Sequence, residues 1–387
     1  MRESLPNYRK LHLSLNSHYN SDSKYVSGLI DIIFLVLMKL GFVLGWLGWS
    51  SGNLDTFLAS RLELDRFNMK SAPRIHESIE YVPGLGTISL GGILGRGAAS
   101  VVFAIVEFPE MVIKYQANCF DPDGIHPLIR DEFFGLKAFQ VGVGVEPTFL
   151  SPPVQVPHYR TTKTDFFSAC GGTELRFIIM QRVDSCFAHG QAGSIPLALT
   201  VGTWMVSLLH KLHTQAGVIH GDVHAGNVCT LTTDEAGMRV VLIDYEHAKF
   251  VSEETDVRAL SQVPPHASQS PWELIGFETS RRDDIYNALS LVGDLMADGS
   301  VWKHAENLSH SGRFNDLVEW RANGLIYTSP VDLITRGLET EEQVSNVKYH
   351  LHAAMQKVLE LVSSKSEINY YAIFDDLFRA LEWTHVA

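Results

Sequence analysis

The sequence predicts an α+β protein: a strand-rich unit comes first, a helix-rich unit follows, and an N-terminal extension precedes both. Between residues 84 and 115, glycines separate short runs of β-branched residues, which is typical of strands joined by tight turns. After Gly190, apolar residues recur at helical spacing, beginning with residues 198–216. A chain of 387 residues has room for two or three folding units, or for one large bilobal unit with an extension.

The composition is that of a folded protein, with 45% hydrophobic and 19% charged residues, which excludes a wholly disordered or coiled-coil chain. The net charge is −13 because 44 acidic residues outnumber 31 Lys and Arg. An acidic surface binds nucleic acid poorly, so we expect no nucleic-acid partner. A phosphate site depends on a few local groups and is compatible with this charge.

The cysteines predict neither a disulfide framework nor a zinc site. No two of them form a C-x-x-C pair, and a chain of this length does not need disulfide cross-links. Pairs of nearby histidines have no cysteine partner or H-E-x-x-H pattern. We therefore expect buried, reduced thiols at all four cysteines, which are Cys119, Cys170, Cys186 and Cys229.

The N-terminal extension is predicted over residues 1–80, and its residues 26–49 are apolar enough to suggest a membrane segment. Asp31 and Lys39 interrupt this run, and each charge would cost about 2.5–3.5 kcal/mol at the centre of a bilayer. One interpretation is a membrane helix or an interfacial anchor, which implies association with a membrane. The alternative is a buried helix that packs on the main domain.

The first strands of the main domain are expected at residues 101–106 and 111–115, joined by a turn at 108–110. A G-x-G-x-x-S-x-V pattern precedes the first of them. Ordinary turn glycines give many such matches, but glycines in a hairpin also let backbone amides approach phosphates without Cβ clashes. A dinucleotide fingerprint would need a helix after the glycines, and here a strand follows. We expect a nucleotide to contact Gly95, Gly97, Ser100 and Val102.

Lys114 ends the second strand, where its ammonium group could reach the phosphates of a bound nucleotide. Such a lysine needs a carboxylate to orient it. Residues 128–140 have helical spacing, and Glu132 on this helix is the expected partner, with Asp131 as the alternative.

The rest of the chain is expected to change from irregular structure to helices. Residues 141–175 contain four prolines and are expected to be irregular, and residues 175–180 form a buried strand. A capping box at 340–343 precedes one of the helices that make up the C-terminal third.

The segment 218–228 is the most specific in the chain, because it places Asp222 and Asn227 five residues apart in an apolar frame. Phosphoryl transfer needs a carboxylate that accepts the hydroxyl proton and an amide oxygen that holds Mg²⁺. Asp244 follows a predicted buried strand at 240–243, and its carboxylate is a further hard-oxygen ligand for Mg²⁺.

Taken in order, these residues resemble the signature of the protein kinase superfamily. The resemblance spans roughly residues 85–300 and implies a bilobal kinase-like fold, with a β-rich N-lobe and hinge at 81–183 and a helical C-lobe at 184–387. It implies ATP and Mg²⁺ as cofactors. It also implies that Met180 is the gatekeeper residue and that Val183 belongs to the hinge that binds adenine.

The chain departs from the protein-kinase pattern in two motifs. His220-Gly221-Asp222 replaces His-Arg-Asp, with His224 in the place of a lysine, and Asp244-Tyr245-Glu246 replaces Asp-Phe-Gly. Both motifs are more similar to aminoglycoside phosphotransferases and choline kinases. In that arrangement His224 would stabilise the transferring phosphate.

The C-lobe, in contrast, resembles the casein kinase one group of protein kinases. Ser270-Pro271-Trp272-Glu273 is similar to the motif that closes an activation segment, and residues 280–286 read Ser-Arg-Arg-Asp-Asp-Ile-Tyr. The resemblance gives Asp284 a structural role, which is to accept hydrogen bonds from backbone amides of the catalytic loop. Because Gly221 replaces the arginine that would bind a phosphate, we expect little dependence on phosphorylation of Ser252, Thr255, Ser261, Ser268 or Ser270.

These observations favour a divergent serine/threonine protein kinase, with Asp222, Lys114, Glu132 and His224 in catalytic roles. The first alternative is a kinase that phosphorylates a small-molecule hydroxyl. The second is a pseudokinase or a membrane-tethered scaffold. The lysine and the metal-binding residues of the signature are all present, which argues against this second alternative.

Overall fold

The structure is a computed structural model that describes residues 78–82, 85–96, 100–117, 125–151, 154–155, 174–187, 194–233, 237–256, 269–297, 300–323, 338 and 340–385. The segment Ile79–Ile88 forms a short hairpin and belongs to a different compact unit from Ser89–Ala387. In that hairpin, the Leu85 backbone N–H donates to the Val82 carbonyl at 3.0 Å. Residues 1–77 of the extension predicted over 1–80, with its apolar run at 26–49, lie outside the described residues, and residues 78–80 belong to β1.

The strand-rich part is one mostly antiparallel sheet with the order β1-β2-β3-β4-β7-β5, and β6 also pairs with β7. Its strands are β1 (Ser78–Val82), β2 (Gly86–Arg96), β3 (Ser100–Ile105), β4 (Met111–Ala117), β5 (Pro147–Leu150), β6 (Val154–Gln155) and β7 (Glu174–Gln181). Alternating residues of β3 are buried, as expected for a strand with one side on a core. Edge-on and tilted contacts between aromatic rings join neighbouring strands of this sheet, through Phe103, Tyr115, Phe177 and Phe149.

One helix, α4 (Pro127–Gln140), packs against β5 and β7. It begins after His126, whose Nδ1 accepts the Leu128 backbone N–H at 3.2 Å, and proline at the first helical position suits this start. Its buried residues include Asp131, which the helix therefore directs into the protein.

Two small sheets follow the strand-rich part. One has the order β11 (Gly237–Leu242), β10 (Val228–Thr233) and β8 (Ser185–Cys186), and the other pairs β9 (Val218–Ile219) with β12 (Lys249–Phe250). A 3-10 turn at Ala225–Asn227 joins the segment after β9 to β10. These short strands fix the backbone on both sides of the His220-Gly221-Asp222 motif.

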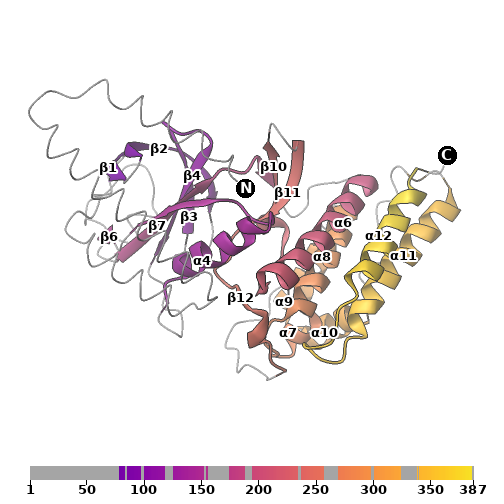
Figure 1. Cartoon of the computed structure of the whole chain (residues 1–387). Coiled ribbons are helices and arrows are strands. Elements are labelled where there is room, and N and C mark those ends of the chain that lie inside the picture. Colours follow the sequence, from indigo (N-terminus) through magenta and orange to yellow (C-terminus); the bar gives the residue numbers. More distant parts are fainter. Residues whose placement is uncertain are drawn as a thin grey trace, which may run out of the picture. The chain divides into compact units, whose positions relative to one another are not determined.

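The helix-rich part consists of α6 (Ile195–Lys211), α7 (Pro271–Leu274), α8 (Arg281–Met296), α9 (Ser300–His310), α10 (Phe314–Ala322), α11 (Glu341–Leu359) and α12 (Tyr370–Trp383). Helix α6 contacts α8 and α12, and α11 packs on α12, so these helices lie side by side (Figure 1). Within the described residues, Ile195–Ala216 is the one helical stretch long and apolar enough to cross a membrane. Its most apolar 18 residues are 56% buried inside the fold.

Most of the predicted elements are confirmed. The hairpin of β3 and β4, helix α4, strand β7 and the capping box of α11 at Thr340 agree with the sequence. The predicted helix at 198–216 is present, but its last turn, Leu212–Ala216, is a π-helix that ends at Gly217 in the left-handed region. The prediction that residues 141–175 are irregular was wrong in part, because this stretch contains β5 and β6, two short strands that pair with β7. Proline at the start of β5 obscured it, since proline is tolerated in a strand only at such positions.

Candidate active site

Several of the residues expected to bind the nucleotide share one cross-strand row of the sheet. Gly95 lies opposite Val102, and Val102 lies opposite Lys114, so the three are on one face of β2, β3 and β4. Ser100 begins β3 and pairs with Gln116. Gly97 lies outside the described residues.

Met180, the residue expected as the gatekeeper, is on the same face of the sheet. Met180 lies opposite Val112 of β4, two residues from Lys114, and alternate residues of a strand point to one side. Val183 lies two residues beyond the end of β7. The two residues before it are held by their backbone N–H groups, since Gln181 donates to the Glu146 carbonyl and Arg182 donates to the Glu110 carbonyl.

Three carboxylates surround the ammonium group of Lys114. Its Nζ lies 2.7 Å from Asp244 Oδ1, 3.2 Å from Asp131 Oδ2 and 3.9 Å from Glu246 Oε2. Burial acts to lower the pKa of Lys114. The charges of the three carboxylates outweigh this effect of burial and raise the pKa of the lysine. Lys114 is therefore protonated at neutral pH.

Asp131, rather than the predicted Glu132, is the carboxylate of α4 that binds Lys114. Asp131 is 4% exposed and uses both oxygens: Oδ2 accepts from Lys114, and Oδ1 accepts the Tyr245 backbone N–H at 2.9 Å. Adjacent helical residues point about 100° apart, so only one of the two can face β4. The spacing in sequence could not distinguish them.

Asp244 has a backbone conformation that suits its position beside Lys114. Its φ is 67°, and it is the one non-glycine residue with positive φ among the described residues. A non-glycine residue in this region costs about 1–3 kcal/mol and is found most often at functional sites. Hydrogen bonds hold both sides of the residue, because Ile243 N–H donates to Asn227 O and Tyr245 N–H donates to Asp131.

The role expected for Asp284 is confirmed. Its carboxylate, fully buried in α8, accepts the His220 backbone N–H at 2.7 Å and the Gly221 backbone N–H at 2.9 Å. It also accepts from His213 Nε2 at 3.0 Å, while His213 Nδ1 contacts the hydroxyl of Tyr370 at 2.7 Å. A chain of buried hydrogen bonds therefore links the first residue of α12 to the His220-Gly221-Asp222 motif.

The imidazole of His220 joins this motif to the strand before Asp244. It is fully buried, and its Nδ1 accepts the Asp222 backbone N–H at 3.2 Å. Since Nδ1 accepts, the ring proton is on Nε2, which donates to the Ile243 carbonyl at 3.1 Å. His220 thus fixes Asp222 relative to Asp244.

The carboxylate of Asp222 is held by two side chains. Asn227 Nδ2 donates to Asp222 Oδ2 at 3.1 Å and to its backbone carbonyl at 3.0 Å. His224 Nε2 lies 3.4 Å from the same Oδ2, and His224 Nδ1 accepts the Gly226 backbone N–H at 3.0 Å. Both contacts engage Oδ2, which leaves Oδ1 as the oxygen that can receive an incoming hydroxyl group.

These contacts set the protonation of the pair. Burial acts to raise the pKa of Asp222, but the hydrogen bond and charge of His224 outweigh it and lower the pKa to about 2. Burial acts in the opposite direction on His224, and the hydrogen bond and charge of Asp222 outweigh it and raise the pKa of the histidine. Asp222 is therefore ionised across the physiological range.

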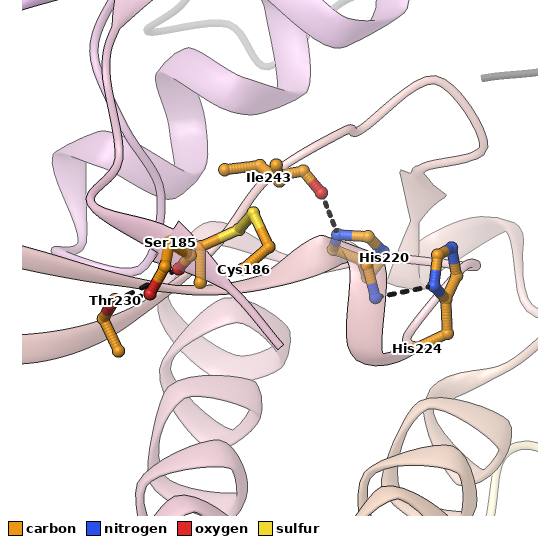
Figure 2. The surroundings of a disulfide bond; sticks show 8 residues. Ser185, Cys186, His220, His224, Thr230 and Ile243 are labelled. Carbon is orange, nitrogen blue, oxygen red and sulfur yellow. Dashed lines mark hydrogen bonds between the residues drawn. A yellow bond between two sulfur atoms is a disulfide. The ribbon is translucent and has the colours of Figure 1, made fainter. Parts of the chain in front are cut away.

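The prediction of reduced thiols was wrong for Cys186 and Cys229, which form a disulfide that joins β8 to β10. Cys119 and Cys170 lie outside the described residues. Cys186 and Cys229 are directly opposite in the antiparallel pair, with Cα atoms 3.8 Å apart. The sequence separates them by 43 residues, so no motif indicated the pairing. Figure 2 shows the bond with Ser185 and Thr230 of the same strands and with His220 and Ile243.

The disulfide belongs to a cluster of apolar residues beside the end of β7, which we call the hinge cluster. Cys229 is fully buried in it, and Met180, Val183 and Ile243 pack against it as partly buried residues. Its members are Val145, Met180, Val183, Cys186, Cys229, Leu231, Val241 and Ile243. Met180, expected as the gatekeeper, and Val183, expected in the hinge, thus lie against one core, together with the residue that precedes Asp244.

The segment after Asp244 is anchored on α8 by a carboxylate. Glu254 is 3% exposed and accepts from the Arg281 backbone N–H at 2.8 Å, from its Nε at 2.9 Å and from its Nη2 at 2.8 Å. Asp256 binds the Ser363 hydroxyl and accepts the Ser364 backbone N–H at 2.7 Å. Residues 257–268 lie outside the described residues.

Of the five hydroxyls considered for phosphorylation, Ser270 is fully buried, where its hydroxyl binds Asp283 and caps α7. Ser261 and Ser268 lie outside the described residues. Ser270 is thus part of the core of the helical region.

The sequence did not indicate three further residues that hold the candidate site in place, which are Glu246, Gln116 and Tyr370. Glu246 Oε2 accepts from Gln116 Nε2 at 2.7 Å and so binds the segment after Asp244 to β4. The spacing of Lys114 and Gln116 on one face of β4 was the only signal that could have suggested this contact. No local pattern indicated Tyr370, because it reaches His213 across 157 residues of sequence.

The donor set fits a magnesium ion. Asp244 offers a carboxylate, and Asn227 directs its amide nitrogen to Asp222, so the amide oxygen of Asn227 is available to a cation. Asp131, Asp244 and Glu246 share the ammonium group of Lys114. Burial, together with the charge of Asp244, raises the pKa of Asp131 and of Glu246, so a further cation at this cluster would favour the ionised carboxylates.

Comparison with known proteins gives a match in structure and none in sequence. No protein-family model matches the chain, and neither does any curated protein sequence. Among solved structures, vaccinia related kinase 3 is similar with a TM-score of 0.52 and 13% sequence identity, over 84% of this chain and 96% of that chain. The chain therefore has a protein-kinase-like fold.

Proposed function

We propose that the protein is an ATP- and Mg²⁺-dependent phosphotransferase, and that its acceptor is a serine or threonine hydroxyl of a protein. The observation that supports this proposal is the convergence of Lys114, Asp244, Asn227 and Asp222, which contact one another directly or through one residue. They come from β4, the end of β11 and the turn before β10, so the fold alone brings them together.

In this proposal, Lys114 binds the α- and β-phosphates of ATP, and Asp131 orients its ammonium group. The face of the sheet that bears Gly95, Val102 and Met180 covers the nucleotide, and the backbone near Val183 binds adenine. Asn227 and Asp244 hold Mg²⁺, which when bound neutralises charge on the phosphates.

The acceptor hydroxyl donates a hydrogen bond to Asp222. Because the pKa of Asp222 is about 2, the carboxylate accepts this hydrogen bond at neutral pH, and it orients the hydroxyl oxygen toward the γ-phosphate. Asn227 and His224 keep the carboxylate in one orientation through Oδ2. The proton on His224 Nε2 lies beside this oxygen and stabilises its negative charge.

A small-molecule kinase is the second candidate, and the geometry at Gly221 favours it. The position that holds arginine in protein kinases has no space for a side chain here, because a Cβ atom would lie 2.6 Å from the His247 carbonyl oxygen. The buried Ser270 and the anchoring of Glu254 on α8 support the protein-kinase alternative, since they order the end and the start of a segment on which a peptide could rest.

The experiment is transfer of labelled γ-phosphate from ATP to acidic and basic proteins and, in parallel, to a panel of hydroxylated metabolites. Asp222→Asn and Lys114→Met are the matched inactive variants. Transfer to protein that both substitutions abolish supports the first proposal, and transfer only to a metabolite supports the second. Activity of the wild type no greater than that of either variant would contradict both and leave a scaffold as the function.

A further inference from the structure

We propose that Cys186 and Cys229 are a reversible dithiol–disulfide couple that regulates nucleotide binding, an inference that rests on the proposed phosphotransferase function. In this proposal, oxidation of the two thiols modifies the proposed nucleotide site. The structure has the oxidised form, with the disulfide between Cys186 and Cys229.

The position of the bond connects it to both sides of the proposed nucleotide site. Cys186 is three residues beyond Val183 in the hinge, and Cys229 is two residues beyond Asn227, a proposed Mg²⁺ ligand. The bond therefore joins the segment that leaves the hinge to the strand that begins at the metal ligand. Ile243, which packs on the same cluster, directly precedes Asp244.

The pairing of β8 with β10 has other support, so the couple can change state without loss of the fold. The backbone N–H groups of Asp184 and Phe187 donate to the carbonyls of Thr230 and Val228, both at 2.9 Å. The Asp184 carboxylate accepts the Thr232 backbone N–H at 2.6 Å. These bonds flank the disulfide on both sides and stay in place when it is broken.

A reductant can reach one of the two residues. Cys229 is fully buried, whereas Cys186 is partly exposed. Reduction by a dithiol begins when its thiolate attacks Cys186 Sγ, which breaks the bond to Cys229 and leaves Cys229 as a thiolate that takes up a proton. The second thiolate of the reductant then attacks the reductant's own sulfur in the mixed disulfide and releases Cys186. Two electrons and two protons pass to the protein, and the dithiol becomes a cyclic disulfide.

The chemistry of the site favours a responsive bond over a structural one. Disulfides in proteins that work where thiol systems keep cysteines reduced are usually transient or redox-sensing, and the proposal places Cys186 and Cys229 in this class. This chain also has a large buried core, and domains of this size do not generally need cross-links to fold.

Reduction changes the hinge cluster directly. Two thiols cannot remain at bonding distance, so their sulfur atoms must separate within a cluster that also holds Met180, Val183 and Ile243. The covalent link between the hinge segment and β10 is lost at the same time. Because a preorganised site binds more tightly than one that must be ordered on binding, the oxidised protein should bind nucleotide more tightly.

The test uses the full chain with Cys119→Ser and Cys170→Ser substitutions, so that Cys186 and Cys229 are the only thiols. Binding of a fluorescent ATP analogue with Mg²⁺ is measured before and after reduction with dithiothreitol. Alkylation and mass measurement count free thiols in each sample, and circular dichroism verifies the fold. Cys186→Ser in the same background is the control that cannot form the bond.

We expect binding to weaken about threefold or more on reduction, and we expect Cys186→Ser to bind like the reduced protein under both conditions. Two free thiols before reduction, resistance to glutathione buffers at a cytosolic ratio, or equal affinity in both states would overturn the regulatory role and leave the proposed function intact. Absence of nucleotide binding in both states would instead contradict the proposed function itself.

Discussion

A Cβ atom at Gly221 would lie 2.6 Å from the carbonyl oxygen of His247, so the backbone beyond Glu246 occupies the space that a side chain at this position of the His220-Gly221-Asp222 motif would need. Gly221 also has a φ of 81°, which L-residues with side chains rarely adopt. The unusual His-Gly-Asp sequence is therefore a steric requirement of this backbone. The contact also joins the two segments that carry Asp222 and Asp244.

Gly221→Ala should destabilise the protein by about 2–4 kcal/mol, because the strained φ and the clash with His247 act together. Its activity should fall more than its stability, since Gly221 precedes Asp222. Gly237→Ala is the matched control: Gly237 has a φ of 66°, but nothing lies within 4 Å of an added Cβ. Urea denaturation of both variants measures the difference, and equal destabilisation would show that the contact with His247 is unimportant.

Asp131→Asn should weaken nucleotide binding by about tenfold, because the ammonium of Lys114 loses a charged partner at 3.2 Å. Glu132→Gln, one position further along α4, should have the smaller effect. Titration with an ATP analogue and Mg²⁺ compares the two variants directly. A larger loss for Glu132→Gln would restore the assignment expected from the sequence.

Tyr370→Phe should cost about 1–3 kcal/mol of stability, because the buried Nδ1 of His213 loses the hydroxyl that contacts it. The change should also lower kcat more than it raises KM for ATP, since His213 is hydrogen-bonded to the carboxylate that holds His220 and Gly221. Tyr371→Phe alters the neighbouring residue of α12, whose side chain is 75% exposed, and should leave both quantities unchanged. Denaturation and steady-state kinetics on the pair test this link.

Glu254→Gln should destabilise the segment after Asp244, because the guanidinium of Arg281 would lose its buried anionic partner. Breaking such a pair from one side costs about 3–5 kcal/mol. Limited proteolysis should then show faster cleavage within residues 257–268. Since a carboxylate already anchors this segment, phosphatase treatment of the wild type should leave its activity unchanged, and a loss of activity on dephosphorylation would contradict this role for Glu254.

Stability should fall as pH rises from about 4.5 to 8 because of Glu273. Burial, followed by the charge of Asp283, raises the pKa of this carboxyl from 4.5 to about 8. Between these values the folded protein holds a proton that the unfolded chain has released, so ionisation favours unfolding, by at most about 1.4 kcal/mol per pH unit. Glu273→Gln should flatten the dependence, whereas Glu360→Gln, on an exposed residue, should not. Denaturation curves across this range decide the point.

Local patterns in the sequence were sufficient for much of the fold. The β-branched runs gave β3, β4 and β7, and the apolar spacing gave α4 and α6, because each of these signals lies within one element. Strand β5 was missed because it is short and starts with proline. The pairing of β8 with β10 and the disulfide on it were missed because strand pairing joins segments that are distant in sequence.

The sequence by itself determined which residues are candidates for the site. Spacing and residue type singled out Lys114, Asp222, Asn227 and Asp244. Only the tertiary structure decided how they are held. The sequence favoured Glu132 over Asp131 as the partner of Lys114, and packing of α4 on the sheet selects Asp131. Tyr370 and the Cys186–Cys229 pair became visible only in three dimensions, because hydrogen bonds and covalent links between distant segments leave no periodic trace in the sequence.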